Sequence, residues 1–220
     1  AGKSSLFNII GGTHLPDGGS VLLDGEDVTF RSQHYRAKAI GRLFQDPAVS
    51  SAPALTVGEN LALAGMSGGW LARMNHADRQ RFQEALSRLG MGLEEHFDQE
   101  VGTLSGGQRQ ALSLVMATVN PPTLLLLDEH TAALDPASAD QVIEITGKTV
   151  SDNNLTCLMI THNMNQAISL GNRLIMMDKG RIIYDVSGAE KQNLTVADLL
   201  EKFRRQSGTV LDNDRMLLSR

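Results

Sequence analysis

Leu104-Ser105-Gly106-Gly107-Gln108 is the most specific stretch of this sequence. The residues that follow it include the apolar positions of a buried helix: Ala111, Leu112, Leu114 and Val115. The backbone N–H groups in the first turn of a helix have no partner inside that helix, so they can bind an anion. The serine hydroxyl and the two glycines leave these groups accessible. The stretch therefore predicts a helix N-terminus that contacts a phosphate, whereas a plain Ser-Gly-Gly loop is the alternative.

Downstream, four leucines at 124–127 are followed by Asp128 and Glu129. The apolar run predicts a buried strand. An aspartate at its end suits Mg²⁺, and a glutamate beside it suits a general base that orients water toward a γ-phosphate. A buried strand with an acidic exit turn is the structural alternative.

Upstream, Gly2-Lys3-Ser4 matches the end of the phosphate-loop pattern G-x-x-x-x-G-K-[ST]. In that pattern the lysine reaches the β- and γ-phosphates, and the serine hydroxyl binds Mg²⁺. The first four motif positions would precede Ala1, so the alternative for this segment alone is a flexible terminus.

The spacing of apolar and turn residues predicts an α/β chain with an inserted helical region. We expect strands at 20–23, 40–44, 123–127 and 156–161, and a hairpin around 178–180. Helices are expected at 3–10, from Thr56 as a capping-box residue with Glu59, around 82–89, after Asp135-Pro136, around 167–170 and after Thr195. Strands that alternate with helices imply a parallel sheet with ligands at the carboxyl ends of its strands.

The composition of the chain makes some classes of function and structure less expected. The formal net charge is -5, which lowers the expectation of a nucleic-acid partner. Cys157 is the one cysteine, so no internal disulfide can form, and its place in an apolar strand predicts an inert thiol. No apolar run approaches the roughly 18 residues of a membrane-spanning helix.

These motifs occur in one order: Gly-Lys-Ser, then Gln45 after a strand, Ser105–Gln108, Asp128-Glu129, Asp135, and finally His162 at a strand end. In this order and spacing the sequence resembles the ATP-binding-cassette (ABC) ATPase family over essentially the whole chain. The resemblance implies a P-loop NTPase (RecA-like) core with a mostly parallel sheet and an inserted α-helical subdomain. The expected boundaries are 1–47 and 120–206 for the core, 48–119 for the subdomain and 207–220 for a tail.

The resemblance also implies roles for individual residues. Catalysis would use Glu129, the switch histidine His162, and Gln45, which senses Mg²⁺ and the attacking water. ATP would contact Gly2, Lys3, Ser4 and Ser5 of the phosphate loop, and Ser105, Gly106, Gly107, Gln108 and Asp135 from the opposite subunit of a dimer. Mg²⁺ would contact Ser4, Gln45 and Asp128.

Two departures from the family pattern stand out. His130 follows the catalytic pair, where many relatives carry a different residue, and structural variation is the favoured reading. The family stacks adenine on an aromatic residue upstream of the phosphate loop, a stretch that precedes Ala1. We therefore expect the natural gene product to be longer at its N-terminus, and this chain alone to bind ATP poorly.

The function that the resemblance implies is ATP hydrolysis by the nucleotide-binding subunit of an ABC transporter. The expected partners are a second copy, an integral-membrane permease and an extracytoplasmic solute-binding protein, with the subunit at the cytoplasmic face of the membrane. The run at 128–136 looks most like subunits of bacterial uptake systems for amino acids or similar solutes.

Two alternatives remain. A soluble ABC-type ATPase of DNA repair or translation would carry long coiled coils or a second cassette, and neither feature is visible. A regulatory subunit that does not hydrolyse ATP would have lost Glu129 or His162, and both are present.

Overall fold

The computed structural model describes residues 2–46, 49–66 and 74–207, so most of the tail expected at 207–220 lies outside the described residues. The chain divides into two compact units. Asp17–Met159 form one of them, and Ala1–Pro16 with Ile160–Arg220 form the other. Each unit is described by itself below.

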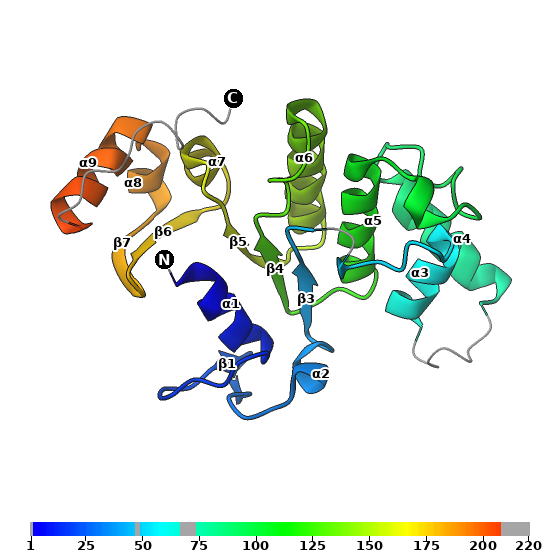
Figure 1. Cartoon of the computed structure of the whole chain (residues 1–220), viewed down its shortest axis with the longest axis horizontal. Coiled ribbons are helices and arrows are strands. Elements are labelled where there is room, and N and C mark those ends of the chain that lie inside the picture. The colour runs from blue at the N-terminus through cyan, green and yellow to red at the C-terminus, as the bar shows by residue number, and fades with distance from the viewer. Residues whose placement is uncertain (1, 47–48, 67–73, 208–220) are drawn as a thin grey trace. The chain divides into compact units, whose positions relative to one another are not determined.

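The larger unit is built on a three-stranded sheet in the order β3-β4-β5 (Figure 1). The strands are β3 (Ile40–Leu43), β4 (Leu124–Asp128) and β5 (Thr156–Ile160). β3 and β4 run parallel, with Leu43 opposite Leu127. The α/β class and the parallel pairing that the sequence predicts are confirmed.

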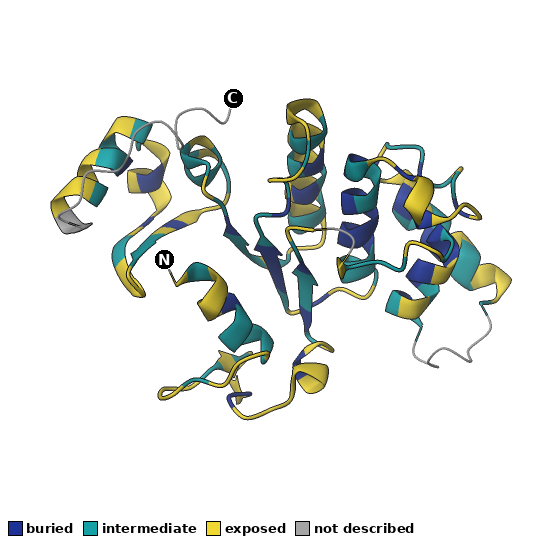
Figure 2. Ribbon diagram, in the orientation of Figure 1, coloured by how far each residue is buried: buried dark blue, intermediate teal, exposed yellow. Residues whose placement is uncertain are grey.

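Two helices pack on one face of this sheet, α5 (Gly106–Thr118) and α6 (Pro136–Asp152). Their contact with the strands forms a hydrophobic cluster in which Leu114 of α5 and Ile145 of α6 meet Leu125 and Leu127 of β4. The three central leucines of β4 are fully buried, and Figure 2 shows the buried residues along β4 and α5. An uninterrupted apolar run is what a strand covered on both faces requires.

A second hydrophobic cluster belongs to the helical region. It joins α5 to α3 (Val57–Gly65), α4 (His76–Ser87) and a 3₁₀ turn at Val101–Thr103. The predicted capping box of α3 is present, because the Thr56 side chain accepts from the backbone N–H of Glu59 and the Glu59 carboxylate accepts from that of Thr56. The boundaries expected for a separate subdomain, 48 and 119, stay a prediction.

The segment from residue 17 to β3 contains little regular structure. β1 (Leu22–Leu23) and β2 (Glu26–Asp27) form a short hairpin, and α2 (Gln33–Arg36) follows. The strand expected at 20–23 begins two residues late, because the backbone N–H of Val21 donates to the Thr29 hydroxyl at 2.8 Å.

The smaller unit contains α1 (Lys3–Gly11), α7 (Met164–Ser169), β6 (Arg173–Asp178), β7 (Arg181–Ser187), α8 (Gly188–Gln192) and α9 (Val196–Ser207). Its core is formed by Leu174, Val186 and Leu199. The predicted hairpin between β6 and β7 is confirmed, and its turn residues Lys179 and Gly180 both have positive φ, as a tight hairpin turn requires.

Candidate functional site

The predicted end of the phosphate loop lies at the start of α1. Gly2 precedes the helix with φ 98°, a conformation that favours glycine. A Cβ atom at Gly2 would lie 3.0 Å from the Cα of Gly180, so the close approach of the two backbones also requires glycine. Lys3, Ser4 and Ser5 occupy the first helical turn, whose N–H groups lack helical partners. This arrangement suits an anion.

Three of the predicted site residues lie at the carboxyl edge of the parallel sheet. Gln45 stands two residues beyond Leu43, and Glu129 stands two residues beyond Leu127, the partner of Leu43. Asp128 is the last residue of β4. The register therefore brings these side chains to one edge, where ligands of parallel sheets bind.

Glu129 has an unusual backbone. Its φ is 47°, in the left-handed region that residues other than glycine, asparagine and aspartate adopt infrequently. Such conformations cluster at active sites, where the surrounding structure must hold them. The left-handed conformation of Glu129 directly follows the last residue of β4, Asp128.

The sequence reading missed a partner of Asp128. The Nη2 atom of Arg42, on β3, lies 3.6 Å from Oδ2 of Asp128, and the two side chains are only 15% and 18% exposed. The guanidinium also lies over the ring of Phe44, 4.6 Å from its centroid. The sequence did offer one indication of such a partner, because Arg42 is a charged residue inside the otherwise apolar stretch Ile40–Leu43.

The Ser105–Gln108 stretch forms a complete capping box at the start of α5. The backbone N–H of Gln108 donates to the Ser105 hydroxyl at 3.2 Å, and the backbone N–H of Ser105 donates to Oε1 of Gln108 at 3.1 Å. The spacing of serine and glutamine could have revealed this pair. The two side chains therefore define where the helix begins, and the N–H groups of Gly106 and Gly107 belong to its first turn, which lacks helical partners.

The two glycines of this stretch lie close to the start of α6. A Cβ on Gly106 would lie 3.2 Å from Cδ2 of Leu134, and one on Gly107 would lie 3.2 Å from Cβ of Ser138. Asp135 caps α6 by accepting from the backbone N–H of Ser138 at 3.0 Å. Hydrogen bonds from Ser138 hold the pKa of Asp135 below its usual value. Within the larger unit, the structure thus brings the stretch Ser105–Gln108 next to Asp135, two segments that the sequence assigns to the same nucleotide site.

The two histidines near these motifs have different surroundings. His130 is 3% exposed, its Nε2 lies 3.3 Å from Oγ1 of Thr146, and burial lowers its pKa to about 4. It is therefore a neutral side chain that packs the loop after Glu129 onto α6. His162, in the smaller unit, is exposed and lies between β5 and Asn163, the residue that caps α7.

The predicted site residues offer hard oxygen ligands: a carboxylate at Asp128, a hydroxyl at Ser4 and an amide at Gln45. Mg²⁺ prefers such oxygens and binds through one or two carboxylates together with substrate phosphates. Among the described residues, no group of three or more histidine, cysteine, aspartate or glutamate side chains could hold a metal by itself. Each of these donors is of a kind that Mg²⁺ accepts, and their joint role as its ligands stays a prediction.

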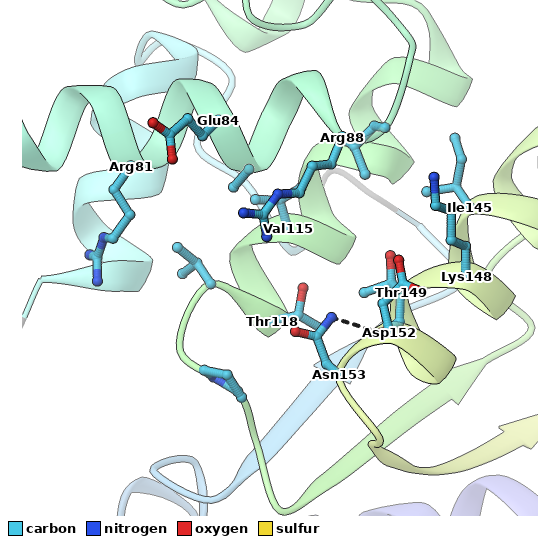
Figure 3. A pocket seen from close by; sticks show the side chains of 14 residues that line it. Arg81, Glu84, Arg88, Val115, Thr118, Ile145, Lys148, Thr149, Asp152 and Asn153 are labelled. Atoms are coloured by element: carbon cyan, nitrogen blue, oxygen red, sulfur yellow. Dashed lines mark hydrogen bonds between the residues drawn. The ribbon is translucent and has the colours of Figure 1, made fainter.

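Pockets open on the described part of the larger unit. A pocket of about 460 Å³ lies along β3 and α5 and is lined by Arg42, Phe44, Val49 and Ser113, among others. Another pocket, of about 390 Å³, lies between α4, α5 and α6 and contains none of the predicted site residues (Figure 3). Its rim carries the charged side chains of Arg81, Arg88, Lys148 and Asp152.

The sequence matches the ABC transporter family over residues 1–132. It is 44% identical to the tyrosine transport ATP-binding protein of Clostridioides difficile (strain R20291), over 92% of this chain and 81% of that protein. It is 35% identical to the methionine import ATP-binding protein MetN 1 of Pseudomonas putida, but there it spans only 56% of the relative's length. The thiamine import ATP-binding protein ThiQ of Photorhabdus laumondii is also 35% identical, over 84% of this chain and 75% of that protein.

Solved structures give the same picture. A dimeric ATP-binding cassette, solved in a post-hydrolysis state with ADP and Pi, superposes with a TM-score of 0.71 at 28% identity, over 84% of this chain and 80% of its own. The cbiO1 protein of Clostridium perfringens superposes with a TM-score of 0.75 over 93% of this chain and 79% of its own, and its 24% identity supports the fold alone.

Proposed function

The chain belongs to the ABC transporter family of ATP-binding subunits. From this membership we propose that it hydrolyses ATP to drive the uptake of an amino acid through a separate permease. The observation that carries the proposal is the 44% identity to a tyrosine transport subunit over 92% of the chain, against 35% for the methionine and thiamine subunits. Relatives that are named for transport disfavour a soluble role in DNA repair or translation.

Each motif has a role in this proposal. Lys3, Ser4 and the first-turn N–H groups of α1 bind the phosphates. Glu129 accepts the proton of the attacking water, and its left-handed backbone, φ 47°, supports a specialised position. Gln45 and His162 orient the water and the γ-phosphate.

Mg²⁺, when bound, neutralises charge that develops on the phosphate oxygens during transfer. We assign its protein ligands to Asp128, Ser4 and Gln45, whose oxygen donors fit it. Asp128 stands at the edge of the sheet where Gln45 also lies, which supports this part of the assignment.

We propose that two copies act together, so that the stretch Ser105–Gln108 of one copy contacts the nucleotide held by the other. The capping box that opens α5 at Ser105, and the cap residue Asp135 of α6 close to it, support this arrangement. The dimeric relative with ADP and Pi gives a precedent at 28% identity.

The permease would dock on the 460 Å³ pocket beside β3. Val49, which is 65% exposed, gives this pocket an apolar wall at the loop that follows Gln45. The subunit would then work at the cytoplasmic face of the membrane, beside a permease that receives solute from an extracytoplasmic binding protein. Among the described residues, no helix is both long and apolar enough to cross a membrane.

The substrate class can be tested by uptake in the host cell. Deletion of the gene should abolish uptake of radiolabelled tyrosine, and the wild-type gene should restore it while Glu129→Gln does not. Uptake of thiamine serves as the control and should persist. Loss of thiamine uptake, with tyrosine uptake intact, would contradict the amino-acid assignment. Loss of methionine uptake instead would keep an amino acid as the solute and contradict only the choice of tyrosine.

A further inference from the structure

Arg42 is a charged, mostly buried residue on β3, an outer strand of the described three-stranded sheet. It lies opposite Leu126 in the β3–β4 register, so Asp128, two residues further along β4, points to the same face of the sheet. The register thus explains why the guanidinium of Arg42 reaches the carboxylate of Asp128 at 3.6 Å. Both side chains are less than a fifth exposed, so salt screens their attraction less than it would at the surface.

Phe44 makes a second contact with the guanidinium of Arg42. It follows Arg42 by two residues, and its ring lies 4.6 Å from the guanidinium carbon. A cation over an aromatic ring is attracted by the ring electrons, and arginine makes this contact more often than lysine. Arg42 therefore contacts both a carboxylate and an aromatic ring, three residues before Gln45.

Arg42 and Phe44 also belong to the residues that line the 460 Å³ pocket beside β3 and α5. Arg42 therefore takes part both in the pocket wall and in the ion pair with Asp128 at the sheet edge.

We propose that Arg42 is a positioning residue of the hydrolytic site, which holds Asp128 in an ion pair that Mg²⁺ must weaken in order to bind, while Phe44 holds Arg42 in place. The proposal rests on the proposed role of Asp128 as a magnesium ligand. Two cations compete for one carboxylate, so the strength of the Arg42 contact sets how readily the metal binds. An occupant of the pocket that draws Arg42 away therefore favours metal binding.

The test measures Mn²⁺ affinity by electron paramagnetic resonance, with the purified subunit and the non-hydrolysable analogue adenylyl imidodiphosphate. Arg42→Met removes the charge and keeps an unbranched apolar chain, and it should bind Mn²⁺ about fivefold more tightly, the effect of losing a competing ion pair of ordinary strength. Arg42→Lys keeps the charge but contacts the Phe44 ring less well, so its Mn²⁺ affinity should lie between those of the wild type and Arg42→Met. Arg88→Met, in the pocket of Figure 3, makes the same charge change away from Asp128 and should leave the affinity unchanged.

Phe44→Leu tests the support of the guanidinium without changing any charge. It should raise Mn²⁺ affinity by less than Arg42→Met, and it should add nothing in an Arg42→Met background. This variant also carries the test if Arg42→Met fails to fold, which circular dichroism would reveal.

Asp128→Asn separates the proposed role of Arg42 from the proposed role of Asp128 as a magnesium ligand. If Asp128→Asn weakens Mn²⁺ binding while Arg42→Met and Phe44→Leu match the wild type, the role of Arg42 is wrong and the metal ligand stands. If Asp128→Asn binds Mn²⁺ as the wild type does, the assignment of the metal ligand itself is wrong. Weaker binding in Arg42→Met would also overturn the proposal, because it would make Arg42 a helper of the metal rather than its competitor.

Discussion

Glu129 stands directly after Asp128 at the carboxyl end of β4, in a left-handed backbone conformation. Its carboxylate is the proposed base for the water that attacks ATP. Glu129→Gln keeps the size of the side chain and removes the base, so steady-state hydrolysis should fall by about 10²–10⁴-fold while ATP binding persists. Turnover measured with a coupled phosphate assay checks this, and equilibrium binding of a fluorescent ATP analogue is the control. Turnover within about threefold of wild type, set against that range, would remove Glu129 from this role.

Cys157 gives a second test at the residue scale. It packs against the cluster around β4, and burial raises the pKa of its thiol to about 11. Because only the thiolate reacts, alkylation of the native protein should be slow at pH 8 and should accelerate about tenfold per pH unit up to pH 10. Protein unfolded in urea, whose thiol has an ordinary pKa near 8.5, should react fast and level off above pH 9. A native rate that also levels off near pH 9 would show that the thiol is accessible and unperturbed.

At the scale of elements, α3 depends on a glycine. A Cβ on Gly58 would lie 2.3 Å from Cε1 of Phe97, a ring that is itself 2% exposed and has no room to move. Gly58→Ala should therefore lower the free energy of unfolding by about 1–3 kcal/mol. Gly147 is the matched control: it lies exposed in α6 with no atom within 4 Å of an added Cβ. Gly147→Ala should raise stability by up to about 1 kcal/mol because alanine favours helix.

Urea unfolding followed by circular dichroism measures both glycine variants. Opposite signs of the two changes are the expected result. A Gly58→Ala protein as stable as the wild type would mean that α3 and Phe97 are not packed as the structure has them.

Some of these elements could be predicted from the sequence and others could not. Helix starts were readable because Thr56 and Asp135 cap through side chains whose spacing is local. The ion pair between Arg42 and Asp128 could not be predicted from the sequence. It depends on the register of two strands about 80 residues apart in the chain, and no local pattern encodes register. The left-handed backbone of Glu129 was equally hidden, since nothing in its residue type demands positive φ.

At the scale of the whole molecule, the proposed machinery is divided between the two units. Gly2–Ser5 and His162 belong to the smaller unit, and the residues of the sheet edge and of α5 belong to the larger one. The sequence order of the motifs predicted the family, which the comparisons confirm. The roles of the individual residues stay predictions, because they depend on a bound nucleotide and on a second copy.

The central claim is that each ATP is hydrolysed between Lys3 of one copy and Ser105 of the other. Ser105→Arg places a long cation where the γ-phosphate would lie, and Lys3→Ala removes a phosphate ligand, so each variant alone should be nearly inactive. In a mixed dimer, one composite site carries both changes and the other carries neither. Mixing the two inactive proteins should therefore restore part of the ATP turnover. No recovery in a mixture that is shown to form mixed dimers would contradict the claim.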